Sequence, residues 1–200
     1  MTDVIGTLHG RLVFGRRTRV LAEHLAQVLP DTGRVLDVGC GDGTIDRLVM
    51  DLRPELQIEG IDILVRPVTH IPVTQFDGDH IPFPDNSFDA VVFVDVLHHT
   101  NDPARLLAEA RRVARRCIVI KDHLAEGLLA WTTLRFMDWV GNAPHGVVLP
   151  YNYWRERQWQ TAFTDTGLSI EEWRSRIGLY PWPASMMFDR RLHFVARLGT

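Results

Sequence analysis

Three glycines and an aspartate form the stretch whose chemistry is easiest to recognise. Asp37 is followed by Gly39, Gly41 and Gly43, which stand two residues apart at the end of an apolar run over 35–38. Glycine lets the backbone turn sharply and lets a ligand approach where a Cβ atom would clash. We therefore expect a buried strand, a tight turn that wraps a ligand, and the start of a helix.

Histidines and a carboxylate follow two further apolar runs. His98 comes shortly after the run over 90–94, and Asp122 and His123 come directly after the run over 117–120. An imidazole has an unperturbed pKa of about 6.5, so it can take a proton from a reacting group near neutral pH. We predict His98 and His123 as catalytic bases, with Asp122 as a carboxylate base or as the group that orients a histidine.

Alternating strand-like and helical segments must position these residues. The alternation indicates an α/β protein whose parallel strands end at one edge of a sheet, where ligands bind in such folds. Predicted helices are 12–29, 44–52, one that starts at 103, one within 128–140, and 153–165. Predicted strands are 35–38, 57–61, 71–76, 90–94, 117–120, 168–177 and 191–198.

Length and composition limit the function further. The chain has 200 residues, of which 46% are hydrophobic, and a formal net charge of -3. These values fit one domain over residues 1–200 and give no reason to expect dedicated nucleic-acid binding. The first residues lack the pattern of a signal peptide, and no apolar stretch reaches the roughly 18 residues of a membrane span. Cys40 and Cys117 are predicted to be free thiols in a reducing compartment, so we expect a cytoplasmic protein.

A second acid stands at the end of the predicted strand 57–61. Asp62 follows the glycines by about 20 residues, which is the spacing at which a carboxylate binds the hydroxyl groups of a nucleotide ribose. S-adenosylmethionine (SAM) and NAD both carry such a ribose. Ile63, the next residue, is predicted to lie near the adenine face.

The pattern D-x-G-x-G-x-G over 37–43 resembles the first motif of the class I SAM-dependent methyltransferases. In that family the loop wraps the amino-acid end of SAM, and the acid at the position of Asp37 indirectly holds the ammonium group. The run IPFPDNSFD over 81–89 is similar to the segment before the fourth strand in the type-11 group of these enzymes. By this register, Asp77 accepts a hydrogen bond from the adenine amino group and Gly78 supplies backbone beside the base, with Asp79 as the competing acid.

The resemblance implies a fold and a set of cofactor-binding residues. The fold is a Rossmann-like three-layer αβα sandwich with a mostly parallel seven-stranded sheet, a C-terminal antiparallel hairpin, and a helical, lid-like insertion over about 124–153 after the fifth strand. The cofactor is SAM, with S-adenosylhomocysteine (SAH) as the product. The predicted cofactor-binding residues are Asp37, Gly39, Cys40, Gly41, Gly43, Asp62, Ile63, Asp77, Gly78 and Asp95.

The implied activity is methyl transfer to a small organic acceptor, with oxygen as the first choice of nucleophile and carbon or nitrogen close behind. All six tryptophans lie in the second half of the chain. Most of them are expected in the core of the insertion. One or two could line the pocket of an apolar or aromatic acceptor. We expect a monomer or a homodimer.

Three other functions stay open at this point. A methyltransferase that acts on a protein or a nucleic acid is disfavoured, because the Asn-Pro-Pro-Tyr-like motif is absent where Asp95-Val96-Leu97-His98 stands. An NAD-linked oxidoreductase is disfavoured by the glycine spacing. A SAM-binding partner protein without catalysis is the third. We expect no metal, because the asparagine that catechol-type enzymes place beside the acid at Asp122 is replaced by His123.

Overall fold

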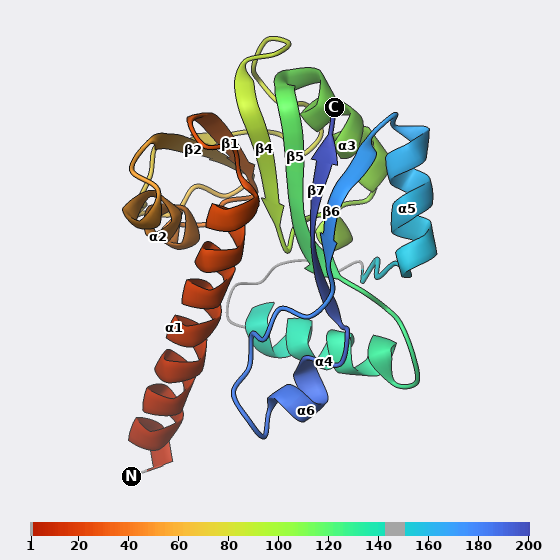
Figure 1. Cartoon of the computed structure of the whole chain (residues 1–200). Coiled ribbons are helices and arrows are strands. Elements are labelled where there is room, and N and C mark those ends of the chain that lie inside the picture. Colours follow the sequence, from red (N-terminus) through yellow and green to blue (C-terminus); the bar gives the residue numbers. More distant parts are fainter. Residues whose placement is uncertain (1, 143–150) are drawn as a thin grey trace.

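Seven strands form one sheet, and helices cover both of its faces (Figure 1). The computed structural model describes residues 2–142 and 151–200, and for residues 2–14, 141 and 142 it describes only the backbone. The strands are β1 (Gly33–Val38), β2 (Leu56–Asp62), β3 (Val73–Gln75), β4 (Phe88–Val94), β5 (Ala114–His123), β6 (Ser169–Arg174) and β7 (His193–Gly199). The helices are α1 (Thr2–Val28), α2 (Thr44–Leu52), the 3₁₀ turn η1 (Leu97–His99), α3 (Pro103–Val113), α4 (Ala130–Asn142), α5 (Glu156–Asp165) and α6 (Ser185–Phe188).

The sheet has the order β3-β2-β1-β4-β5-β7-β6. The strands β1 to β5 are parallel, and β7 is antiparallel to both β5 and β6. The ends of β1, β2, β4 and β5 therefore meet at one edge of the sheet, which we call the carboxyl edge. This topology confirms the predicted mostly parallel seven-stranded sheet with antiparallel C-terminal strands.

The three layers follow from side chains that point alternately to the two faces of the central strands. In β4, Ala90 and Val92 belong to the core that packs under α1 and α2, and Val91 and Phe93 belong to the core under α3 and α5. All four side chains are buried. Because successive side chains of a strand point to opposite faces, a strand covered on both sides has a continuous apolar sequence.

Several predicted boundaries are wrong. The first helix starts at Thr2 rather than at residue 12, and the last two strands cover Ser169–Arg174 and His193–Gly199 rather than 168–177 and 191–198. The strand β3 covers only three residues. Ile71, which was predicted to belong to it, is buried against Gly43 instead.

The strand β5 is longer than predicted, and this changes the setting of its last three residues. It pairs with β7 as far as His123, which lies opposite His193. Lys121, Asp122 and His123 are thus part of the strand rather than of a loop beyond it. Because side chains alternate along a strand, Asp122 points to the opposite face from its two neighbours.

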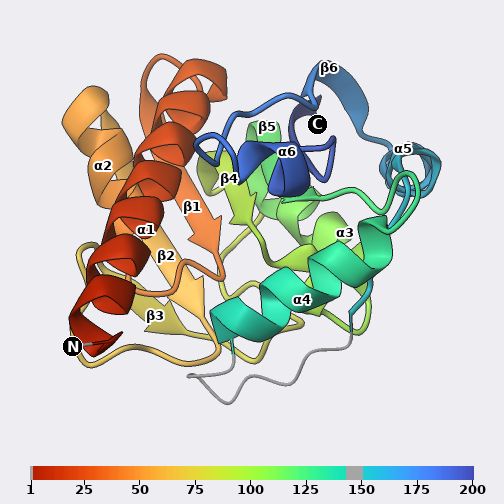
Figure 2. The same cartoon turned by 90° about the horizontal axis from the view of Figure 1, so that it is seen from below.

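The insertion after β5 lies where the sequence predicts it. Figure 2, seen from below the sheet of Figure 1, shows α4 passing across the carboxyl edge. This helix buries Leu134 but exposes Trp131, Phe136 and Trp139. Residues 143–150 of the predicted insertion lie outside the described residues. Among the helices that the structure describes, none is long and apolar enough to cross a membrane.

Candidate functional site

The three glycines of the first turn have different neighbours. A Cβ atom added at Gly39 would lie 2.5 Å from Val96 Cγ2, and one added at Gly43 would lie 2.4 Å from Ile71 Cγ1. A Cβ atom added at Gly41 would meet no atom within 4 Å. The turn is therefore packed against the protein at its two ends and open at Gly41, where the backbone can approach a ligand.

A cavity opens beside Gly41 at the carboxyl edge. Helix α1 forms one wall of it, and the turn after β1, the start of α2 and the end of β4 form the rest. Its lining residues are Arg17, Thr18, Leu21, Cys40, Gly41, Asp42, Thr44, Ile45, Val94 and Asp95. Three of the predicted cofactor-binding residues, Cys40, Gly41 and Asp95, thus line one cavity.

Asp62 lies beside the same turn, at the end of β2. Its Oδ2 accepts a hydrogen bond from the Gly41 backbone N–H at 2.8 Å, and its Oδ1 accepts one from the Leu64 N–H at 2.9 Å. A carboxylate oxygen has more than one lone pair, so both oxygens keep the capacity to accept from ribose hydroxyls. Asp62 therefore holds the glycine turn in place and stands at the predicted position of the ribose partner.

The residues predicted around the adenine lie on neighbouring loops. A Cβ atom added at Gly78 would lie 3.2 Å from Ile63 Cγ2, so these two residues are in contact, and Ile63 is exposed. Asp77 Oδ1 accepts hydrogen bonds from the backbone N–H groups of Asp79 and His80. These hydrogen bonds lower the pKa of Asp77. Asp77 is therefore an ionised acceptor at a tight turn, while Asp79 lies 3.6 Å from Arg105.

Asp37 is buried next to a second acid that the sequence analysis did not single out. Burial and the nearby Asp46 raise the pKa of Asp37 well above its usual range. Burial likewise raises the pKa of Asp46 to about 6. One oxygen of each carboxyl group is buried without a hydrogen-bond partner. The pair therefore retains a proton near neutral pH, and it is well placed to attract a cationic group of a ligand.

Asp95 sits between two cations at the end of β4. Lys121 Nζ forms an ion pair with Asp95 Oδ1, and Arg17 donates a hydrogen bond to Asp95 Oδ2 at 2.6 Å. Burial alone would raise the pKa of Asp95, but Lys121 and the neighbouring cations hold it well below its usual range. Lys121 and Arg17 therefore both belong to ion pairs with Asp95.

The predicted catalytic residues come together, but they are buried. Exposed fractions are 1% for His98, 0% for Asp122 and 3% for His123. His98 Nδ1 lies 2.6 Å from Asp122 Oδ1, and Asp122 also accepts hydrogen bonds from the backbone N–H groups of Leu97 and His123. Asp122 thus orients His98 and has no oxygen directed to an open cavity.

The two histidines differ in charge. Burial opposes the charged form of His98, but the Asp122 carboxylate outweighs this and raises the pKa of His98 to about 10. Burial lowers the pKa of His123 well below its usual range, with Asp95 only partly offsetting this effect. Without a bound ligand, His98 is therefore a poor base at neutral pH, whereas His123 is neutral.

Two further members of this cluster escaped the sequence analysis. Asp138 of α4 lies 3.4 Å from His98 Nε2 and 3.7 Å from His123 Nε2. The Tyr153 hydroxyl group donates a hydrogen bond to Asp138. A signal for Asp138 was present, because it is the only acid in the apolar helix over 130–142.

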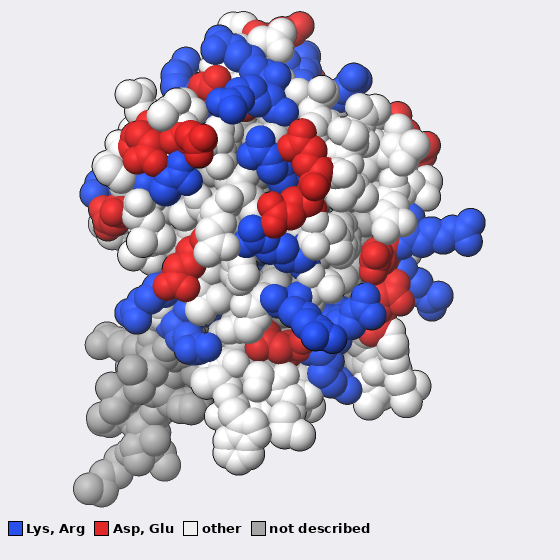
Figure 3. Space-filling model, viewed as in Figure 1, with Lys and Arg blue, Asp and Glu red and all other residues white. Residues whose placement is uncertain are grey.

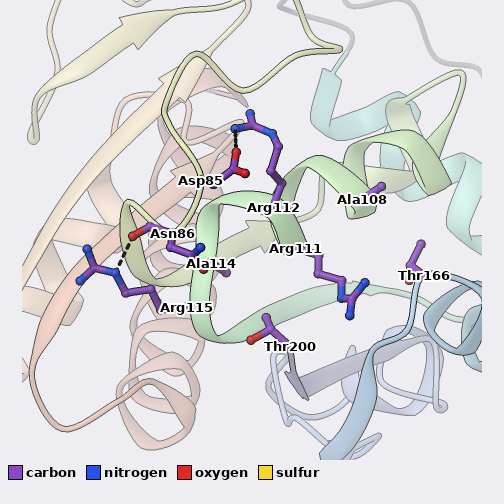
Figure 4. Close-up of a pocket in the computed structure, with 9 residues that line it drawn as sticks. All are labelled: Asp85, Asn86, Ala108, Arg111, Arg112, Ala114, Arg115, Thr166 and Thr200. Carbon is purple, nitrogen blue, oxygen red and sulfur yellow. Dashed lines mark hydrogen bonds and ion pairs between the residues drawn. The ribbon is translucent and has the colours of Figure 1, made fainter.

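A larger hollow, of about 500 Å³, lies at the opposite end of the sheet. Figure 4 shows Arg112 turned toward Asp85 and Arg115 turned toward Asn86 in it. Figure 3 shows Lys and Arg side chains gathered at this end of the molecule, in the upper part of the view. Ligands of open α/β sheets bind at the carboxyl ends of the strands, so the cavity at Gly41 is the candidate site.

Comparison with known proteins decides the family. Residues 13–172 match a family described as a methyltransferase domain. The chain belongs to the class I SAM-dependent methyltransferases. The predicted family and fold are thus confirmed, and membership implies SAM as the cosubstrate.

Two curated relatives of this methyltransferase illustrate the range of the family. A demethylmenaquinone methyltransferase from Thermotoga maritima is 34% identical over 107 residues, which cover 50% of this chain and 45% of the relative. A 27-O-demethylrifamycin SV methyltransferase from Amycolatopsis mediterranei is 30% identical over 113 residues, or 49% of this chain and 41% of the relative. The matched region therefore spans less than half the length of these relatives.

Solved structures share the fold over most of the chain. A SAM-dependent methyltransferase from Mesorhizobium loti has a TM-score of 0.66 at 18% identity, with 89% of this chain and 96% of that chain covered. A Haloferax volcanii protein in complex with the Trm112 methyltransferase activator has a TM-score of 0.70 at 19% identity, with 92% and 90% covered. At these identities the likeness concerns the fold alone.

The residues at the cavity fit SAM. Gly41 leaves open space where any other residue would place a Cβ atom, and Asp37 keeps a buried carboxyl oxygen without a hydrogen-bond partner. These are the features that a methyltransferase needs for close backbone contact and for a cationic amino-acid end.

We expect Gly41→Ala to weaken SAH binding at least tenfold, because its Cβ atom would occupy the open side of the turn. Gly178→Ala is the matched control: both glycines have a positive φ, 62° and 71°, and both face open space. Each substitution should cost about 1–2 kcal/mol in folding, because alanine is strained in the left-handed region. Isothermal titration with SAH should show a loss for Gly41→Ala only, and an equal loss in both variants would contradict the assignment of the turn.

Proposed function

We propose that the chain transfers a methyl group from SAM to a small organic acceptor, with oxygen as the preferred nucleophile and carbon or nitrogen as alternatives. One observation carries this proposal. Asp95 lines the cofactor cavity and also lies 3.5 Å from His123 Nε2, within the cluster of histidines and carboxylates. The cofactor cavity is therefore directly next to groups that can receive a proton.

Different residues would bind different parts of SAM. Asp62 would accept hydrogen bonds from the ribose, Asp77 from the adenine amino group, and Ile63 and Gly78 would flank the base. Gly39, Cys40, Gly41 and Gly43 would wrap the amino-acid end, with Asp37 beneath it. When bound, SAM supplies an activated methyl group, so the protein mainly has to align the acceptor and exclude water.

His123 is the better candidate for the base. Its pKa is low enough to keep it neutral, and a neutral imidazole is the form that takes a proton from a hydroxyl group. His98 and Asp122 then act as the buried pair that keeps this corner of the site rigid and polar. A positioned base of this kind contributes roughly 10²–10⁴-fold to a rate.

The surface around α4 supports an apolar or aromatic acceptor. Trp131, Phe136 and Trp139 are exposed on the helix that crosses the carboxyl edge, and aromatic side chains in such positions commonly contact ligands. The prediction that most tryptophans form the core of the insertion is wrong, because Trp131 and Trp139 are exposed and the buried Trp159 lies in α5 and packs in the main core. The two relatives named above are, by name, methyltransferases of demethylmenaquinone and of 27-O-demethylrifamycin SV, which supports a small-molecule acceptor. The free thiols Cys40 and Cys117 are consistent with a cytoplasmic location, which stays a prediction.

Ligand-dependent melting tests the proposal. SAH at 100 times its dissociation constant should stabilise the chain by about 2.7 kcal/mol, whereas NAD should leave the melting temperature unchanged. Turnover is then measured with radiolabelled SAM and a panel of phenolic, quinol and aliphatic hydroxyl acceptors. A shift with NAD alone would overturn the cofactor assignment. SAH binding with no transfer to any small acceptor would favour a binding protein or a macromolecular substrate.

A further inference from the structure

We propose that His98, His123 and Asp138 form a binding site for a divalent transition-metal ion, next to Asp95 and the cofactor cavity. No metal was expected from the sequence, and Asp138 joins the site from the insertion after β5.

The hydrogen bonds of the cluster fix the tautomer of His123. His193 Nε2 lies 3.0 Å from the carbonyl oxygen of Phe188, which can only accept, so His193 carries its proton on Nε2. His193 Nδ1 is then an acceptor, and His123 Nδ1, at 3.1 Å, must donate to it. This leaves a lone pair on His123 Nε2, which faces Asp95 and Asp138.

The hydrogen bonds of His98 likewise show which of its ring nitrogens donates. Its Nδ1 donates to Asp122, so in the neutral ring Nε2 carries a lone pair. The side chain is 1% exposed, and Nε2 has no hydrogen-bond partner. The nearest group is the Asp138 carboxylate, which is also an acceptor. With both rings neutral, two imidazole lone pairs face a carboxylate, so a cation is needed among them: either a second proton on His98, in line with its raised pKa, or a metal ion.

The separations suit a metal ion. Zinc binds imidazole nitrogen at about 2.0–2.1 Å and carboxylate oxygen at about 2.0–2.2 Å, so neighbouring ligand atoms in a tetrahedron stand about 3.4 Å apart. Here His98 Nε2 lies 3.4 Å from Asp138 Oδ2, and His123 Nε2 lies 3.7 Å from Asp138 Oδ1. Ligand atoms of Asp95, His98 and His123 all fall within 4.8 Å of one another. Ligand atoms of His98, His99 and Asp138 form a second group within the same range.

A supporting shell is already in place. Metal-bound histidines usually donate their second ring N–H to a carboxylate or another acceptor, which fixes the ring. Asp122 does this for His98, and His193 does it for His123. Tyr153 donates to Asp138 in the same way.

The charge of the surroundings also favours a cation. Three carboxylates (Asp95, Asp122 and Asp138) face two cationic side chains (Arg17 and Lys121), so one negative charge is left for either a proton on His98 or a metal ion to balance. Because Asp95 already pairs with both cations, we place it beside the site rather than among its ligands. Two imidazoles and one carboxylate are a ligand set for zinc or ferrous iron rather than for magnesium.

A metal ion at this site would determine which acceptors the chain can use. This part of the inference rests on the proposed function. A coordinated hydroxyl group loses its proton more readily, so the ion would take over from His123 the task of generating the oxygen nucleophile. The acceptor expected at the site is then a phenol or an enol that can coordinate through oxygen.

The test uses Zn²⁺ and Co²⁺ as probes on the chelator-treated full chain. We expect one Zn²⁺ per chain with a micromolar or tighter dissociation constant, and a Co²⁺ form with the intense visible absorption of a four-coordinate ion. His123→Gln and Asp138→Asn should each weaken Zn²⁺ binding at least a hundredfold. His70→Gln, an exposed histidine elsewhere on the carboxyl edge, should leave it unchanged.

The rival occupant of the site is a proton on His98 Nε2, which would donate to Asp138. Nitrogen NMR of the histidine side chains separates the two: Zn²⁺ should displace that proton, and a His98 ring that stays doubly protonated in excess Zn²⁺ overturns the proposal. Equal Zn²⁺ affinity in the parent and in His123→Gln also overturns it. SAH titration of each variant keeps the conclusions separate, because SAH binding should persist when metal binding is lost, whereas failure of the proposed function would appear as no SAH binding in the parent chain.

Discussion

Replacing Lys121 with methionine should lower the free energy of unfolding by about 3 kcal/mol, because it leaves the Asp95 carboxylate beside an apolar group. The Lys121 side chain is 0% exposed and forms an ion pair with Asp95. Burial lowers the pKa of Lys121, so Asp95 is the group that keeps it charged. Removing one partner of a buried pair usually costs about 3–5 kcal/mol. We expect the lower end because Arg17 still contacts Asp95. For a chain of this size the melting temperature should fall by about 6–12 °C.

Two further variants make this result specific. Arg17→Met removes the other cation from the same carboxylate, but the Arg17 side chain is 31% exposed, so its loss should cost about 1 kcal/mol or less. The double variant Lys121→Met with Asp95→Asn should recover part of the lost stability, because no unpaired charge is left. Chemical denaturation of these proteins and of Asp95→Asn alone gives the coupling energy of the Lys121–Asp95 pair. A loss below about 1 kcal/mol for Lys121→Met would show that the pair is not a structural ion pair.

The parts of the fold that follow from local pattern could be predicted from the sequence. Strand β4 has a continuous apolar run because it is covered on both faces. The three glycines mark the turn after β1, because a side chain would clash at two of them and would fill open space at the third. Asp62 could be placed because its distance from the glycines along the chain fixes the strand end on which it stands. These features depend on neighbours in sequence and on one parallel sheet, which the alternation of strands and helices already indicates.

The histidine cluster could be predicted only in part. The positions of His98 and His123 follow from the ends of β4 and β5, but their burial and charge follow from groups on distant elements. Asp138 comes from α4 and His193 from β7, and neither stands at a strand end of the parallel sheet. The contacts that an insertion makes depend on how it packs against the rest of the fold. A single sequence does not specify that packing. Asp122 was predicted as a possible base for the same reason. Its place inside the strand depends on the pairing of β5 with β7, which the sequence does not show.

The acid pair beneath the glycine turn should make the stability of the chain depend on pH in an unusual direction. Asp46 has a pKa of about 6 in the folded chain against 3.8 in the unfolded one, so the folded state holds the proton more tightly. The stabilisation is therefore fully present below about pH 4 and is lost as the pH rises through about 6. Its size is about 3 kcal/mol, from about 1.4 kcal/mol per pKa unit.

Asp46→Asn should remove this dependence while keeping the shape of the side chain. The free energy of unfolding of the variant minus that of the parent should rise by about 2–3 kcal/mol between pH 4 and pH 7, since only the parent has to ionise a buried carboxyl group. Asp51→Asn, at the exposed end of the same helix, should change stability by less than about 0.5 kcal/mol at any pH. Urea denaturation at a series of pH values measures both differences. A flat difference for Asp46→Asn would mean that Asp46 does not titrate with a raised pKa in the folded chain.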